Sequence, residues 1–192
     1  TGSEALAHCE QLVAGGDYYF LHPHKCPPFL AGSETIAREI VEDRPDTSRI
    51  YVPIGGGGLL SAICAAAESS STEIEVLGVE AEQAPAFARS FQAGRPVAIA
   101  EMDTIADALT INEPDGEVFD YVASRTSRIV TVSEEEIVNA MRSLFDEFRV
   151  IAEPGGAASL AAMVKSDDGK NAAAIISGGN VSLDEFLQIT GS

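Results

Sequence analysis

The feature that most constrains this chain is a run of four glycines at residues 55–58, between an apolar stretch and an alanine-rich one. RIYVPI, residues 49–54, is typical of a buried strand, and LLSAICAAAE, residues 59–68, is typical of a helix. Glycine accepts positive φ angles and lets backbone N–H groups come close to a ligand, but four in a row cost conformational entropy. The dipole and the unpaired N–H groups of a helix N-terminus favour an anion. The pattern therefore predicts a phosphate site in this loop.

The loop matches neither GxxxxGK[ST] nor a strict GxGxxG, so a ligand-free β–α turn stays open as the alternative. A second glycine-ended strand is expected in IISGGN, residues 175–180. The hydroxyl of Ser177 there suits a polar ligand atom, although the same residues also suit a capped turn. Ligands of open α/β sheets bind at the carboxyl ends of strands, so both glycine segments are candidates to face one ligand.

Predicted strands alternate with predicted helices along the whole chain, and several strands are continuously apolar. This pattern indicates a three-layer α/β fold with a mostly parallel sheet, in one domain covering residues 1–192. Ser133, followed by three glutamates, predicts a helix start. The expected strands are 18–21, 49–54, 73–80 and 128–133, followed by a strand and turn within 171–180. The expected helices are 3–14, 31–43, 59–68, 84–94, 115–125, 134–149, 156–166 and 182–190.

Charge and cysteine content exclude several function classes. The chain has 30 acidic and 12 basic residues, a net charge of −18, which opposes binding to nucleic acid or to an anionic membrane surface. No apolar segment approaches the length of a membrane span. Three cysteines without a ligand spacing indicate free thiols in a reducing compartment, so we expect a cytoplasmic protein.

A metal cluster is one alternative for the segment HPHKC. In an extended chain, His22, His24 and Cys26 would point to the same side, and their side chains suit zinc. The prolines interrupt regular structure and no fourth ligand is evident, which favours an ordinary loop. Glu134–Glu136 is interpreted as a set of helix-start acids rather than a paired-carboxylate site.

Five segments in order resemble a known family: VPIGGGGLLSA, GVEAEQAPA, TIADAL, AEPGGAASLAA and ISGGNVS. They are similar to the matching blocks of fold-type II enzymes that use pyridoxal phosphate (PLP), the tryptophan synthase β-like family, in its threonine dehydratase and serine racemase group. The resemblance covers essentially the whole chain. It implies the large PLP-binding domain of that family and a reaction in which a small hydroxyamino acid loses water and then ammonia.

The resemblance also implies roles for particular residues. Ser177 would hydrogen-bond the pyridine nitrogen, with Gly178 beside it, and Glu153 would lie close to the cofactor. Glu80 matches a carboxylate that binds a divalent cation in some members, although Ala86 stands where a second carboxylate is usual. The residues around the PLP phosphate would be Gly55, Gly56, Gly57, Gly58 and Leu59.

The family's Schiff-base lysine, in an SFKxRGA-like motif, and its SxGNH-like asparagine block are not found in this chain. Lys25, in an exposed-looking loop, and Lys165 and Lys170, beside a polar turn, are poor substitutes. We therefore expect the C-terminal portion of such an enzyme, without the small domain and inactive on its own. A homo-oligomer or a partner chain would cover the missing edge. The alternative is a non-catalytic module derived from this fold, which binds a phosphate ligand or another protein.

Overall fold

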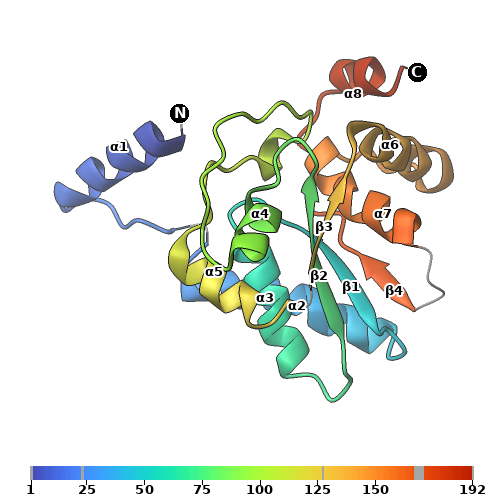
Figure 1. Ribbon diagram of the computed structural model, residues 1–192, viewed down its shortest axis with the longest axis horizontal. Helices are drawn as coiled ribbons and strands as arrows, with labels where there is room; N and C mark the ends of the chain where they lie inside the picture. Colours follow the sequence, from blue (N-terminus) through green and yellow to red (C-terminus); the bar gives the residue numbers. More distant parts are fainter. Residues whose placement is uncertain (1, 23, 127, 167–170, 192) are drawn as a thin grey trace.

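The computed structural model describes residues 2–22, 24–126, 128–166 and 171–191 (Figure 1). Its strands form one parallel sheet in the order β3-β2-β1-β4. The strands are β1 (Arg49–Pro53), β2 (Glu75–Ala81), β3 (Arg128–Val132) and β4 (Ala172–Ala174). The helices are α1 (Gly2–Ala14), α2 (Pro27–Asp43), α3 (Gly58–Glu68), α4 (Ala86–Ala93), α5 (Gly116–Ala123), α6 (Glu134–Phe148), α7 (Pro154–Ser166) and α8 (Leu183–Thr190), with a short 3₁₀ helix at Asp107–Leu109.

Helices cover both faces of the sheet because the strands are apolar on both. Every residue of β1 is buried, and its side chains alternate between two hydrophobic clusters. Ile50 and Val52 pack with residues of α2, α3 and α5, whereas Tyr51 packs with residues of α6, α7 and α8. This arrangement confirms the α/β class with a mostly parallel sheet.

Local signals place several helix ends correctly. Ser133 Oγ accepts a hydrogen bond from Glu136 N (3.2 Å), and a Glu136 carboxylate oxygen accepts one from Ser133 N (2.8 Å). This reciprocal pair satisfies two donors at the start of α6 and confirms the predicted cap. Gly94 ends α4 with φ 66°, the left-handed conformation that glycine adopts readily.

Two expectations near the N-terminus are wrong. Residues 18–21 form no strand and no helix, and Tyr19 is 83% exposed. Helix α2 begins at Pro27 rather than Ala31, since proline is well accommodated in the first turn of a helix. Ser33 therefore lies inside the helix, where its hydroxyl donates to the Phe29 carbonyl.

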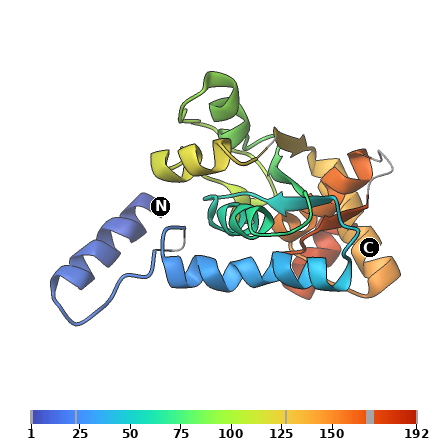
Figure 2. The same ribbon diagram turned by 90° about the horizontal axis from the view of Figure 1, so that it is seen from below.

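Helix α1 stands apart from the α/β body, whereas α2 runs along α3 against the sheet (Figure 1, Figure 2). The connection between α1 and α2 exposes Tyr18, Tyr19 and Leu21. No helix of the described residues is long and apolar enough to cross a membrane.

Candidate functional site

The four-glycine loop lies at the carboxyl end of β1 and leads directly into α3. Gly57 has φ 88°, a conformation that a residue with a side chain rarely adopts, and Gly58 is the first residue of the helix. The loop is also tightly packed. A Cβ on Gly55 would lie 2.7 Å from the Ala108 carbonyl oxygen, and one on Gly57 would lie 2.6 Å from Val118 Cγ1. Gly57 therefore requires glycine for both conformation and space, and Gly55 requires it for space.

The second glycine segment lies at the same edge of the sheet. β4 pairs with β1 in parallel, with Ala174 opposite Tyr51, and Ile175 N donates to the Tyr51 carbonyl over 3.0 Å. Because both strands run in the same direction, Ser177 follows β4 where the glycine loop follows β1. Ser177 is exposed at this edge. The structure thus brings the two predicted glycine segments together on adjacent strands.

Glu153 fixes the turn that contains Ser177. The Glu153 N–H donates to the Gly178 carbonyl over 3.1 Å, and a Glu153 carboxylate oxygen accepts from Asn180 N over 3.0 Å. A Cβ on Gly178 would overlap this carboxylate, and one on Gly156 would overlap the Gly178 backbone. Glu153 is therefore close to the site, where it holds the turn 177–180 against the start of α7.

The segment TIADAL forms a wall of the site that the sequence did not assign to it. Glu134 holds this segment, since its carboxylate accepts from Thr104 Oγ1 over 2.6 Å and from Ile105 N over 2.9 Å. The following Ala108 and Leu109 pack against Gly55 and also against Gly155 at the start of α7. Because this contact joins residues far apart in sequence, it is visible only in three dimensions.

Glu80, the expected cation ligand, is fully buried at the end of β2. Its two carboxylate oxygens accept from Phe87 N over 2.8 Å and from Ala88 N over 2.9 Å, at the start of α4. Burial raises the pKa of Glu80 to about 7, and the two backbone hydrogen bonds only partly oppose that rise. Among the described residues there is no group of three His, Cys, Asp or Glu side chains suited to a metal ion. The geometry therefore gives Glu80 a helix-capping role and does not support a cation site.

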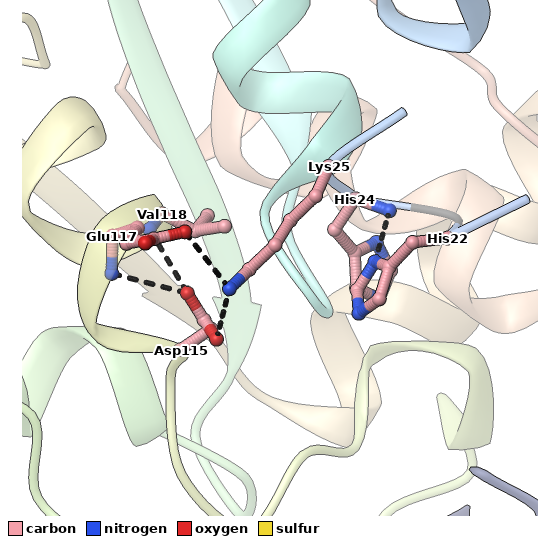
Figure 3. A network of polar contacts seen from close by, with 6 residues as sticks. All are labelled: His22, His24, Lys25, Asp115, Glu117 and Val118. Atoms are coloured by element: carbon pink, nitrogen blue, oxygen red, sulfur yellow. Dashed lines mark hydrogen bonds and ion pairs between the residues drawn. The ribbon is translucent and has the colours of Figure 1, made fainter. Parts of the chain in front are cut away.

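Two lysines have acidic partners. Lys25 Nζ lies 2.7 Å from Asp115 Oδ2 and 3.0 Å from Glu117 Oε2 (Figure 3). The hydrogen bond to Asp115, and then the one to Glu117, raise the pKa of Lys25. The pKa of Lys165 is raised chiefly by its hydrogen bond to Glu136, 3.0 Å away. A raised pKa keeps both amines protonated and so poor nucleophiles, while Lys170 lies outside the described residues.

His24 is the site residue that the sequence reasoning missed. A Cβ on Gly56 would overlap the His24 imidazole, whose Nε2, Cδ2 and Cε1 are its three nearest atoms. The ring therefore lies directly against the backbone of the glycine loop. His24 N donates to His22 Nδ1 over 3.2 Å (Figure 3). Among the described residues, His22, His24 and Cys26 belong to no group of three side chains suited to a metal ion, and the segment forms a loop before α2. No local pattern pointed to the contact between His24 and Gly56, because it joins residues far apart in the chain.

A cavity of about 350 Å³ adjoins this loop. Helices α2, α3 and α5 form its walls. Most of its lining is apolar, with carboxylates from Glu34 and Glu117. His24 and Lys25 close it on the side of the glycine loop.

A parallel α/β sheet with a glycine loop and a helix N-terminus at its carboxyl edge is typical of proteins that bind phosphate-bearing ligands. A family model described as pyridoxal-phosphate dependent enzyme matches residues 2–178, and the chain belongs to this family.

Several relatives with named activities are similar to this chain in sequence. The L-threonine ammonia-lyase of Thermotoga maritima is 38% identical over 88% of this chain and 43% of its own length. The catabolic L-threonine dehydratase TdcB of Escherichia coli K12 is 34% identical over 98% of this chain and 59% of its own length. The beta-hydroxyaspartate dehydratase of Paracoccus denitrificans is 37% identical over 92% of this chain and 56% of its own length. The chain thus spans about half the length of these relatives.

Solved structures agree in fold. A threonine deaminase from T.th. has a TM-score of 0.84 at 32% identity, covering 93% of this chain and 66% of its own. The processed threonine deaminase isoform 2 of Solanum lycopersicum has a TM-score of 0.88 at 25% identity, and the match covers 96% of this chain and 55% of that protein. Maize serine racemase has a TM-score of 0.79 at 31% identity, covering 87% and 55%.

The buried Glu80 carboxylate makes stability depend on pH. The folded protein keeps this proton up to about pH 7, whereas the unfolded chain releases it near the ordinary value of 4.5. The free energy of unfolding should therefore fall as the pH rises through this window, with up to about 3 kcal/mol from this group. Glu80→Gln should remove that part of the fall, measured by urea unfolding at pH 5 and pH 7.5.

Glu73→Gln is the matched control, because Glu73 is an exposed carboxylate that lies just before the same strand. It should keep the wild-type change in unfolding free energy between the two pH values. An equal change in wild type and Glu80→Gln would contradict the assignment.

Proposed function

We propose that this chain binds the phosphate group of PLP in the loop Gly55–Gly58, as the C-terminal part of an enzyme of the serine and threonine ammonia-lyase type. The observation that carries the proposal is the geometry of this loop. It pairs a left-handed Gly57 with a helix that starts one residue later, at the edge where Ser177 also lies. The family membership supplies the cofactor, and the named relatives support a small hydroxyamino acid as substrate.

The residues present fit a phosphate group. The loop carries no side chains that would keep a ligand from its backbone, and the N-terminus of α3 adds N–H groups without an intrahelical partner, including that of Leu59, and a favourable dipole. No acidic side chain belongs to the loop itself. One side chain, His24, shares the space at Gly56.

Each residue then has a defined task. Gly55–Gly58 and the start of α3 bind the phosphate, and the Ser177 hydroxyl donates to the pyridine nitrogen. Glu153 keeps the Ser177 turn in place through the Asn180 N–H. PLP, when bound, supplies the electron sink for loss of the substrate hydroxyl.

The reaction also needs a lysine to hold the cofactor and move the α-proton. Lys25 and Lys165 are engaged with carboxylates. We therefore place the reactive lysine outside the described residues, on further polypeptide or on a partner chain. Either one would also cover the exposed Tyr18, Tyr19 and Leu21. Free cysteines in the described residues support a cytoplasmic setting.

The second candidate is a non-catalytic module that retains the phosphate site. The ion pairs of both described lysines favour it, since neither amine is available as a nucleophile. The two candidates share the phosphate site and differ in whether a lysine completes it.

Substitution of Gly57 tests the phosphate site. Gly57→Ala places a methyl group at φ 88° and against Val118, so the loop must shift. Strain of about 1–3 kcal/mol corresponds to weakening of about 5- to 150-fold. The measurement is titration calorimetry with pyridoxine 5′-phosphate, which has no aldehyde and so forms no adduct with surface lysines.

Gly94→Ala is the matched control for that experiment. Gly94 has φ 66° but nothing within 4 Å of an added Cβ, so it carries the backbone cost without touching the site. Its affinity should equal that of wild type. Equal losses in both variants would attribute the effect to general destabilisation and overturn the site assignment.

Ser177→Ala separates ring recognition from phosphate recognition. Loss of one hydrogen bond to the pyridine nitrogen should weaken pyridoxine 5′-phosphate about 2- to 12-fold. Binding of inorganic phosphate to the same variant should not change, because the hydroxyl is assigned to the ring. A loss of affinity for both ligands would contradict the assigned role of Ser177.

The two described lysines should not anchor the cofactor. After addition of PLP and reduction with borohydride, intact mass and peptide mapping should find no adduct confined to Lys25 or Lys165, because both amines are kept protonated. A stoichiometric adduct on either one would favour a complete catalytic site in this chain.

A further inference from the structure

The imidazole of His24 lies against the backbone of Gly56 in the four-glycine loop. Its Nε2 is the nearest atom to a Cβ built on Gly56, closer than any real side chain could approach. Gly56 exposes its backbone on that side only because it has no side chain. A phosphate that binds the backbone N–H groups of this loop must approach the backbone that the ring now covers. The ring and the phosphate therefore compete for one place.

The backbone around His24 is held from both sides. Lys25, the next residue, is tied to Asp115 and Glu117 at the start of α5. Cys26 is buried and is the N-cap residue of α2. On the other side, His22 Nδ1 accepts from His24 N (Figure 3). These contacts fix the backbone and leave rotation of the His24 side chain as the simplest way to clear the loop.

Space for the displaced ring exists next to its present position. The cavity of about 350 Å³ between α2, α3 and α5 is bordered by His24 itself. The carboxylates of Glu34 and Glu117 line the same cavity and suit an imidazole N–H donor.

Building on the function proposed above, we propose that His24 is a latch on the phosphate site. Its imidazole covers Gly56 when no phosphate ligand is bound and must rotate away before the phosphate of a ligand enters. His24 thereby lowers the affinity of the site for every phosphate ligand, because each ligand must gain enough from the glycine loop to offset displacement of the ring. The apparent affinity is reduced by the fraction of molecules in which the ring is displaced.

The test compares wild type, His24→Ala and His8→Ala by titration calorimetry with inorganic phosphate and with pyridoxine 5′-phosphate. His8 lies on the exposed surface of α1, away from the α/β body, and is the matched loss of one imidazole. If the displaced state is about one tenth of the population, His24→Ala should bind both ligands about tenfold more tightly. His8→Ala should bind them as wild type does.

A second readout follows the ring directly. In wild type labelled with ¹⁵N at histidine, pyridoxine 5′-phosphate should shift the imidazole signals of His24 and leave those of His8 unchanged. Unchanged His24 signals in a protein that binds the ligand would overturn the latch.

These outcomes distinguish a failure of the latch from a failure of the proposed phosphate site. Weaker or equal binding in His24→Ala, with measurable binding in wild type, would overturn the latch and leave the phosphate site standing. Absence of binding in folded wild type and folded His24→Ala alike would overturn both. Tighter binding in His24→Ala together with a shift of the His24 signals supports both.

Discussion

The parallel pairing of β1 with β2 and β4 is the constraint on which the site depends. Strand β1 is buried throughout and sits between these two neighbours, so the chain must leave it at one edge of the sheet. Parallel direction places the ends of β1 and β4 at that same edge. The glycine loop and the Ser177 turn are therefore neighbours although more than a hundred residues separate them in sequence. The site follows from the sheet rather than from any local motif.

Close backbone approach is the second recurring element of this edge. Gly55 meets the Ala108 carbonyl, Gly156 meets Gly178, and Gly178 meets the Glu153 carboxylate. Each contact excludes a side chain on the glycine and fixes one loop against another. Because these loops are already ordered, their backbone N–H groups can bind an anion without the entropy cost of ordering a loop. The ring of His24 lies in a similar way against the backbone of Gly56 in the four-glycine loop.

Charge is arranged to restrain this region. Lys25 joins the loop before α2 to the start of α5, and Glu80 holds the start of α4 from a fully buried position. The first pair is partly exposed, so solvent screens it, and its main effect is to position the loop. Glu80 instead makes stability sensitive to pH near neutrality. Lys25, which was weighed as a Schiff-base lysine, and Glu80, which was weighed as a cation ligand, therefore both have structural roles in this fold.

The sequence by itself determined the alternation of strands and helices, the glycine loop between 49–54 and 59–68, and the cap at Ser133, because periodicity, glycine conformation and helix capping act over a few residues. The predicted strand at 18–21 is wrong, because a segment with strand propensity forms a strand only where a neighbouring strand pairs with it. The tertiary structure alone decided that Lys25 pairs with residues 115 and 117, and that His24 covers Gly56. These contacts join residues far apart in the chain, and only the folded sheet and its packed helices set the distance between them.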